Sequence, residues 1–218
     1  MKQFCNGCAN LKMKKIFTTL LSLLLSVSIY AQKQVMQDSL IAHFDLFNYQ
    51  PFEALQLEDT AGNIFNTATL AGKTVYVDFW FTTCPPCIKE IPFFKSLQQR
   101  FSPDTNVVFL SICIENFQRK IAWKESVKSY DLPGTHLFYA LNRPQQINLL
   151  RRYKITFPTY LLLNKDLLVV GYDAPRPSQK GWVEWAIVQT KEGRLLSEAY
   201  KEMINQTDAY KVFCRSLQ

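Results

Sequence analysis

The sequence predicts an α/β fold in which helices cover a central, mostly parallel sheet with an antiparallel end. Apolar runs of β-branched and aromatic residues at 74–81 and 107–114 are typical of strands buried on both faces. A segment with helical spacing, 85–101, lies between them. The 218 residues, 48% hydrophobic and 20% charged, suit a globular chain of one domain or two small ones.

The remaining elements follow in order along the chain. A strand at 55–57, an Asp-, Gly- and Asn-containing turn at 59–63 and a return at 64–65 predict an N-terminal hairpin. The further expected elements are helix 119–130, strand 137–140, helix 144–153, and strands 159–163 and 167–171. Prolines at 175 and 177 interrupt this pattern, and residues 179–218 are expected to form a helical extension.

Residues 1–31 resemble an export signal. Lys14 and Lys15 precede an uncharged apolar run at 16–29, and Ala31 follows where a signal peptidase cuts. The run is shorter than the ~20 residues that span a bilayer, so we expect cleavage, with a retained membrane anchor as the alternative. Met13 would make a conventional start, so residues 1–12, with the pair Cys5 and Cys8, are interpreted as a mis-called extension. Residues 32–51 are expected to form a linker or to hold a short helix at 38–47.

The charge distribution argues against a nucleic-acid partner. The net charge is +7, but residues 1–31 contribute four lysines and no acidic residue, which leaves +3 for the rest of the chain. That excess is small, and no basic stripe interleaves with the aromatic residues. We therefore expect no nucleic-acid binding.

The motif Cys84-Pro85-Pro86-Cys87 carries the chemistry. It follows the strand expected at 74–81 and begins the helix expected at 85–101. The amides and dipole of a helix N-terminus stabilise a thiolate, and one helical turn brings the second thiol within bonding distance. The sequence therefore predicts thiol-disulfide exchange, with Cys84 as the exposed attacking thiol and Cys87 as the resolving thiol.

Two other interpretations of the motif are open. A zinc site needs two further ligands, for which the chain offers His43 and His136 and, in the exported part, no second pair of this spacing. A purely structural disulfide closing so short a loop adds little stability. We therefore expect no metal site and no cofactor.

Further motifs surround the cysteine pair in a fixed order. They are Gly72-Lys73, Val77-Asp78-Phe79-Trp80, the run Cys84-Pro85-Pro86-Cys87-Ile88-Lys89-Glu90-Ile91-Pro92, and Phe157-Pro158-Thr159 before a strand. With the export signal and the segment inserted after the second core strand, they resemble the thioredoxin superfamily and are similar to exported TlpA/ResA-like thiol-disulfide oxidoreductases. The resemblance covers residues 52–178 and implies a three-layer sandwich with a central mixed sheet.

The resemblance assigns roles to individual residues. Asp78, six residues before Cys84, would be a buried acid with a raised pKa that accepts the proton of Cys87 through water; the alternative is an Asp facing solvent. Pro158 would be cis, and with Phe157 it would contact the substrate chain. Glu90 would modulate the cysteines, unless it lies on a solvated helix face.

Other residues depart from the family pattern or have simpler explanations. Thr83 stands where the family usually has Trp, and the Pro-Pro pair removes two N–H groups near the thiolate. Cys113 is expected in the core, and Cys214 is expected as a free thiol on a C-terminal helix. His136 and Trp123 are expected to be structural.

The expected function is an exported enzyme that reduces disulfides of protein partners and is itself reduced by a redox donor protein. Reduction is favoured over oxidation by the resemblance. A peroxiredoxin-like peroxidase is one alternative, although such enzymes need Thr three residues before the reactive Cys, where this chain has Phe81. A non-catalytic binding module of the same fold is the other. After signal cleavage, no stable membrane span is expected.

Overall fold

The computed structural model describes residues 5–141 and 144–217, which divide into a unit Met1–Ala42 and a unit His43–Gln218. The first unit is formed by helix α1 (Cys5–Phe44), whose last two residues belong to the second unit. Its side chains from 17 to 36 are exposed. Among the described residues, no helix is both long enough and apolar enough to cross a membrane.

Helix α1 corrects one expectation. A linker or a short helix was expected between residues 32 and 51, but the helix that ends at Phe44 runs without interruption through Ala31 and Gln32. The chain has no Gly or Pro between Cys8 and Gln50, so no residue in this stretch breaks a helix. The proposed cleavage site and the segment boundaries stay predictions.

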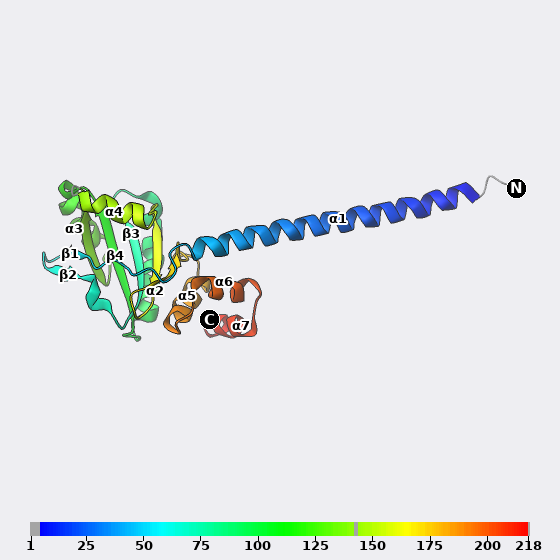
Figure 1. Ribbon diagram of the computed structural model, residues 1–218. Coiled ribbons are helices and arrows are strands. Elements are labelled where there is room, and N and C mark those ends of the chain that lie inside the picture. The colour runs from blue at the N-terminus through cyan, green and yellow to red at the C-terminus, as the bar shows by residue number, and fades with distance from the viewer. Residues whose placement is uncertain (1–4, 142–143, 218) are drawn as a thin grey trace. The chain divides into compact units, whose positions relative to one another are not determined.

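The second unit is built around a seven-stranded sheet with the order β2-β1-β5-β4-β3-β6-β7 (Figure 1). Its strands are β1 (Gln56–Asp59), β2 (Ile64–Asn66), β3 (Thr74–Trp80), β4 (Val107–Glu115), β5 (Thr135–Ala140), β6 (Thr159–Leu163) and β7 (Val169–Tyr172). The pairs β3–β4 and β4–β5 are parallel, and the other pairs are antiparallel. The predicted mixed sheet with an N-terminal hairpin is confirmed.

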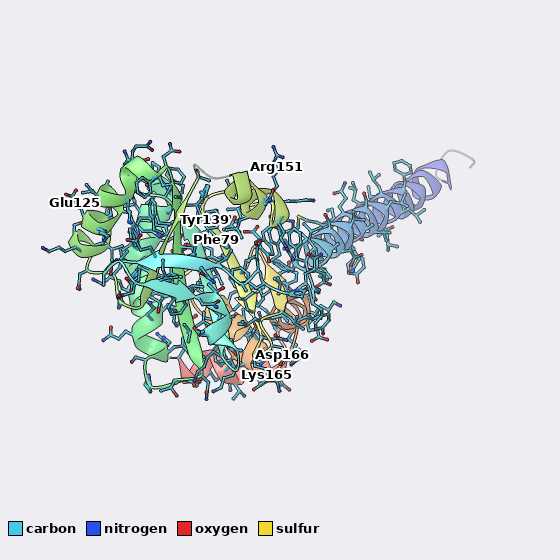
Figure 2. The ribbon with its side chains drawn as sticks, turned by 60° about the vertical axis from the view of Figure 1, so that its left-hand side comes forward. Phe79, Glu125, Tyr139, Arg151, Lys165 and Asp166 are labelled. Atoms are coloured by element: carbon cyan, nitrogen blue, oxygen red, sulfur yellow. A yellow bond between two sulfur atoms is a disulfide. The ribbon has the colours of Figure 1, made fainter. Side chains whose placement is uncertain are left out.

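Alternation along β3 divides its side chains between two layers. Val75, Val77 and Phe79 enter a core that continues through Leu149 and Tyr153 on α4 (Pro144–Arg152) and its C-terminal end. Figure 2 shows Phe79 inside the unit, with the charged side chains of Glu125 and Arg151 at its surface. The helices of the opposite layer are α2 (Pro85–Phe101), α3 (Lys120–Ser129), which follows the 3-10 turn η2 (Phe117–Arg119), and α5 (Trp182–Lys191).

The opposite face of the sheet carries the side chains that matter for the site. Tyr76 contacts Phe94 of α2 at a ring separation of 6.3 Å, and Phe94 contacts Phe109 at 5.8 Å. Beyond them, Trp80 joins a buried cluster with Trp123 of α3. Strands β3 to β6 therefore lie between two helical layers, which confirms the predicted three-layer sandwich.

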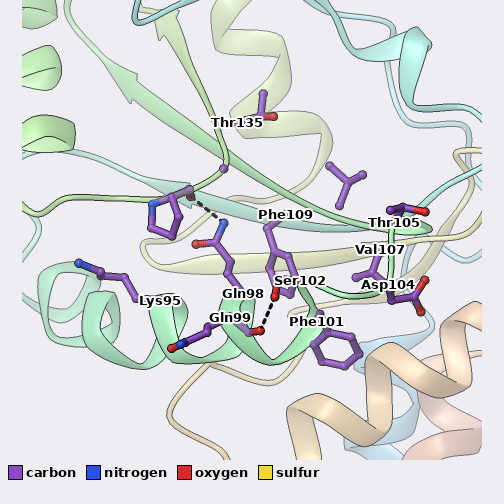
Figure 3. A pocket seen from close by; sticks show the side chains of 13 residues that line it. Lys95, Gln98, Gln99, Phe101, Ser102, Asp104, Thr105, Val107, Phe109 and Thr135 are labelled. Atoms are coloured by element: carbon purple, nitrogen blue, oxygen red, sulfur yellow. Dashed lines mark hydrogen bonds between the residues drawn. The ribbon is translucent and has the colours of Figure 1, made fainter.

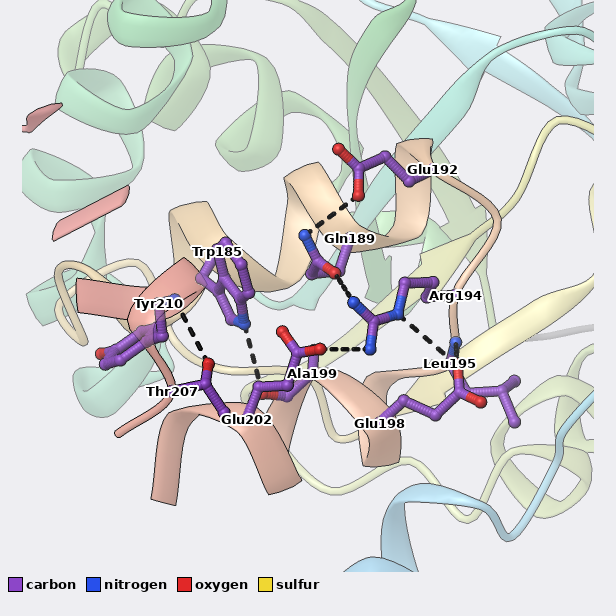
Figure 4. Close-up of polar contacts among 10 residues, drawn as sticks. All are labelled: Trp185, Gln189, Glu192, Arg194, Leu195, Glu198, Ala199, Glu202, Thr207 and Tyr210. Carbon is purple, nitrogen blue, oxygen red and sulfur yellow. Dashed lines mark hydrogen bonds and ion pairs between the residues drawn. The ribbon is translucent and has the colours of Figure 1, made fainter. Parts of the chain in front are cut away.

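The C-terminal residues form α5, α6 (Leu196–Ile204) and α7 (Asp208–Ser216). Arg194, between α5 and α6, donates to Gln189 at 2.6 Å and pairs with Glu198 and Glu202 (Figure 4). The indole N–H of Trp185 donates to the carbonyl of Ala199 at 3.2 Å. These contacts join the first two helices of the extension, and α5 packs on β3 and β6.

A groove of about 580 Å³ lies at the end of the sheet where β4 begins (Figure 3). Gln98 of α2 lines it and donates to the carbonyl of Pro133 at 2.7 Å. Glycine is favoured at the adjacent position 134 because its φ of +100° is a conformation that L side chains rarely adopt. Strands β3 and β4 are parallel, so both begin at the edge of the sheet where this groove lies. Cys84 follows the last residue of β3, at the opposite edge, so the groove is separate from the cysteine pair.

We expect Gly171→Ala to destabilise the second unit, because α6 approaches β7 closely at this glycine. An added Cβ would lie 2.8 Å from Leu196 Cβ and 3.3 Å from Leu162 Cβ. Overpacking of this kind costs about 1–3 kcal/mol. Urea unfolding measures the loss, and the matched control is the same change in a Leu196→Gly background, which removes the Leu196 Cβ and Cδ2 that the added methyl group would meet. An equal loss in both backgrounds would contradict close packing of α6 on β7.

Candidate active site

Cys84 is the N-cap residue of α2. The turn Phe81–Thr83 separates it from the end of β3, and its Sγ accepts a hydrogen bond from the backbone N–H of Cys87 at 3.2 Å. A disulfide joins the two cysteines, whose Cα atoms are 5.2 Å apart. The expected position at the strand–helix junction is confirmed, and the helix N-terminus directs an amide donor at the Cys84 sulfur.

The two prolines fit this helix start and change its electrostatics. Pro85 and Pro86 occupy the first two helical positions, where amides have no intrahelical acceptor, so the helix loses no backbone bond. The prolines do weaken the stabilisation of a thiolate at Cys84, because neither of them has an N–H to direct at the Cys84 Sγ. The amide of Cys87 therefore serves as the first-turn donor to Cys84.

The prediction that Cys84 is the exposed thiol is wrong for the disulfide-bonded protein. Its exposed fraction is 1%, against 4% for Cys87. The physical reason is the cluster around the disulfide, against which Phe81 and Phe157 pack from the two adjoining loops. Position at the helix N-terminus, rather than exposure, is what distinguishes the two cysteines.

Phe157 and Pro158 lie beside this helix start. Thr159 pairs with Phe79 in the antiparallel β3–β6 ladder, so the residues just before β6 adjoin the residues just after β3. The Phe81 and Phe157 rings accordingly meet edge to face at 5.0 Å. The Phe157–Pro158 peptide bond is cis, as the resemblance implies.

Asp78 lies on the α2 side of β3, between Tyr76 and Trp80, as alternation predicts. Burial raises its pKa to about 7, a hydrogen bond from Ser111 Oγ at 3.5 Å opposes the rise, and the charge of Glu90 adds to it. The accessible surface of Asp78 is intermediate, so the carboxyl is half-buried, and its role as a proton acceptor stays a prediction.

A small cavity is lined by both Asp78 and Cys87. Its volume is about 10 Å³, roughly the space of one water molecule measured with a water-sized sphere. The lining residues are Asp78, Trp80, Cys87, Glu90, Ile91, Phe94, Ser111, Leu132 and Tyr160. Cys87 thus lies on the carboxyl side of the disulfide, and Cys84 does not line the cavity.

Glu90 is buried, so the solvated helix face considered for it is excluded. Its carboxylate accepts hydrogen bonds from the backbone N–H of Ser178 at 2.9 Å and from the Ser178 hydroxyl at 2.8 Å. Cys84, Cys87 and Glu90 follow one another at intervals of three residues on α2. Glu90 therefore fixes the segment after β7 to the helix that carries both cysteines.

A buried polar cluster that the sequence reasoning missed holds the loop before Cys84. Glu115, at the end of β4, accepts hydrogen bonds from the Thr82 hydroxyl at 2.8 Å and the Thr82 amide at 3.2 Å. Arg119 forms an ion pair with Glu115 and also donates to the Thr82 hydroxyl. The sequence pattern that could have indicated this cluster is an acidic residue at the end of an apolar strand, Glu115, followed four residues later by Arg119.

The structure also locates the other cysteines and the tryptophan that the sequence analysis named. Cys113 is a free, buried thiol whose pKa is raised by burial, and Trp123 is buried in the same cluster as the disulfide. Cys214 is a free thiol on α7. Within the described part of the chain, no three His, Cys, Asp or Glu side chains gather in an arrangement that could hold a metal ion. The side chains of Cys5 and Cys8 lie outside the described residues.

This fold and site define a protein of the thioredoxin superfamily. The profile of the redoxin family matches residues 48–180, and the chain belongs to that family. Thiol-disulfide oxidoreductase ResA of Bacillus subtilis (strain 168) is 33% identical over 116 residues, which cover 52% of this chain and 60% of the relative. A ResA protein of Bacillus cereus is 31% identical over 113 residues, 51% of this chain and 61% of the relative. The chain thus spans about 60% of the length of these curated relatives.

Solved structures show the same fold. A candidate thiol-disulfide oxidoreductase from Bacteroides vulgatus is 27% identical, with a TM-score of 0.53 over 62% of this chain and 92% of that one. A thiol:disulfide interchange protein from Bacteroides sp. is 23% identical, with a TM-score of 0.55 over 67% of this chain and 93% of that one. At 23% identity, the similarity to the Bacteroides sp. protein is evidence for the fold alone.

Asp78 gives the folded protein a pH-dependent stability. The folded chain keeps the Asp78 proton up to about pH 7, whereas the carboxyl's ordinary pKa is 3.8. Because the folded state binds more protons between these pH values, the free energy of unfolding falls as pH rises through this window. A pKa difference of about 3 corresponds to a loss of at most about 4 kcal/mol, complete above pH 7.

We therefore expect Asp78→Asn to be more stable than the native chain at pH 8 and similar to it at pH 4. Urea unfolding of the disulfide-bonded protein at both pH values measures the difference. Asp166→Asn, at an exposed turn position, is the matched control and is expected to follow the native pH profile. A stability difference that is the same at pH 4 and pH 8 would show that Asp78 does not titrate in this range.

Proposed function

We propose that this protein is an exported thiol-disulfide oxidoreductase that reduces disulfides of protein partners through Cys84 and Cys87. The observation that carries the proposal is the disulfide at the start of α2, with the Cys87 amide directed at the Cys84 sulfur and a partly buried carboxyl on the Cys87 side. The relatives named thiol-disulfide oxidoreductase support the same activity.

The proposed reaction begins with the reduced protein. The Cys84 thiolate attacks a disulfide of the partner, a mixed disulfide forms, and the partner's first thiolate leaves. Cys87 then loses its proton to Asp78 and attacks the Cys84 sulfur, which releases the partner's second thiolate. Two electrons pass to the partner, and the protein ends with the Cys84–Cys87 disulfide. A redox donor protein restores the dithiol.

The surroundings of the disulfide supply the partner contact. Phe157 and Pro158 adjoin the helix start through the β3–β6 ladder, and we assign them to contact the substrate chain. Because Cys84 is buried in the oxidised protein, the Phe81 and Phe157 rings that pack on the cluster must give way before a donor reaches it. Glu90 is assigned a modulating role through the segment it holds at Ser178.

An insulin-reduction assay tests the proposed activity. We expect the native protein, supplied with dithiothreitol, to accelerate insulin precipitation, and Cys84→Ala to reduce the rate to background because the attacking thiol is missing. Cys87→Ala is expected to accumulate a mixed disulfide that mass spectrometry maps to Cys84. The control is Cys214→Ala, on α7, with a native rate. A native protein without activity would favour the non-catalytic binding module, and a faster reaction with peroxide than with insulin would favour the peroxidase.

Export is tested at the N-terminus. The basic residues before the apolar run and the small residue Ala31 predict a mature chain that begins at Gln32 in the periplasm or outside the cell. Cell fractionation followed by N-terminal sequencing checks both statements, and Ala31→Trp is expected to block cleavage without blocking export. A cytosolic protein that retains residues 13–31 would contradict the prediction.

A further inference from the structure

A buried carboxylate lies close to the attacking cysteine. Glu115 is only 8% exposed, and its Oε2 accepts hydrogen bonds from the amide and the hydroxyl of Thr82, two residues before Cys84. The thiol of Cys113 donates to the same oxygen at 4.0 Å, and Cys113 packs in the buried cluster that contains Cys84. The charge of Glu115 therefore acts on Cys84 through the protein interior, where it is screened less than in water.

That charge is unfavourable for the reaction of Cys84. A nearby like charge disfavours the ionised form of a thiol, and the thiolate is the form that attacks. The helix start has little with which to offset it, because Pro85 and Pro86 leave the Cys87 amide as the first-turn donor to the Cys84 sulfur. A carboxylate that holds the loop before Cys84 thus needs a cation of its own.

Arg119, the last residue of η2, supplies that cation. Its guanidinium forms an ion pair with Oε1 of Glu115, and its Nη2 donates to the Thr82 hydroxyl at 2.7 Å. The hydroxyl in turn donates to Glu115 Oε2 at 2.8 Å, so the three side chains form one closed set of contacts. The Arg119 side chain is 43% exposed, against 10% for Glu115, so the cation lies on the solvent side of the carboxylate.

We propose that Arg119 is a positioning residue that cancels the charge of Glu115 beside Cys84, which lets Glu115 hold the loop without opposing the thiolate. Arg119 acts through Glu115 and Thr82 and does not touch the reacting sulfur. No atom or electron is transferred in this role. The inference rests on the proposed function of Cys84 as the attacking thiol.

Other charged and titratable groups lie on the elements around Cys84, and they are the same in the variants compared below. They are Asp78 on β3, Cys87, Lys89 and Glu90 on α2, Cys113 on β4, Lys120 on α3, His136 on β5 and Lys154 before β6. Cys87 would titrate together with Cys84 in the reduced protein. All variants therefore carry Cys87→Ala, which leaves Cys84 as the only thiol of the pair.

The proposal predicts opposite effects from the two members of the ion pair. Arg119→Gln leaves the charge of Glu115 unpaired, so the midpoint pH of Cys84 alkylation is expected to rise. Glu115→Gln leaves the cation unpaired, so the midpoint is expected to fall. The double variant is expected to return close to the starting value. Each single shift should be about 0.5 to 1 in pH, or about 3- to 10-fold in alkylation rate below the midpoint.

The two directions separate charge cancellation from a purely structural role. If the cluster only held the loop, loss of either member would displace Cys84 in the same way, and the double variant would move at least as far as the single ones. Arg119→Lys keeps the charge and is expected to keep the midpoint. Lys128→Gln, at an exposed position in the last turn of α3, removes the same charge at the other end of that helix and is the matched control, with an unchanged midpoint.

The measurement is the rate of alkylation by iodoacetamide in the reduced full chain from pH 5 to 10, with peptide mapping by mass spectrometry to follow the Cys84 adduct alone. An unchanged midpoint in Arg119→Gln, or equal shifts in Arg119→Gln and Arg119→Lys, would overturn the proposal. These two variants decide it even if Glu115→Gln failed to fold, because the Arg119 side chain is half-exposed. No partner disulfide is present, so the expected shifts in a protein that reduces no insulin would support the inference and count against the proposed function.

Discussion

The short turn from β3 into α2 is the constraint on which the site depends. β3 is held on both sides, by β4 and by β6, so its last residue has a fixed position and direction. After the turn Phe81–Thr83, Cys84 caps α2, and the helix must then pass back over the sheet face that carries Asp78. The spacing of three places Cys87 one turn further, beside the cavity, and Glu90 one turn beyond that.

Two carboxyl groups lie under one helix, Glu90 buried and Asp78 half-buried, and such a site is unfavourable unless each group finds a donor or keeps its proton. Glu90 takes two hydrogen bonds from Ser178, in a segment about ninety residues away in sequence. Asp78 has the long bond from Ser111, and burial raises its pKa to about 7. The two carboxyls thus have different tasks. One fixes the loop after β7 to the helix, and the other stays close to proton exchange at neutral pH.

The sequence was sufficient for those features that local pattern determines. β-Branched and aromatic runs located the central strands, apolar spacing gave α2 its bounds of Pro85 and Phe101, and alternation placed Asp78 on the face toward the helix. The exposure of Cys84 was predicted wrongly because it depends on Phe157, which is distant in sequence and reaches the disulfide only through the β3–β6 ladder. The partners of Asp78 were missed for the same reason, since strand register is not local.

The missed cluster around Glu115 shows how the inserted segment is tied to the chemistry. Thr82 lies two residues before Cys84, and both its amide and its hydroxyl are held by a carboxylate at the end of β4. That carboxylate is paired with Arg119, the last residue of η2 and the N-cap of α3. A buried carboxylate without a cation is costly, so the loop before Cys84 and the 3-10 turn before α3 are stabilised together. Polar contacts from β4 and η2 thus hold the loop that leads into α2, and contacts from the segment after β7 hold the second turn of α2. The rings of Phe81 and Phe157, by contrast, hold the other side of the disulfide through apolar packing, which lacks the directional constraint of these hydrogen bonds and ion pairs.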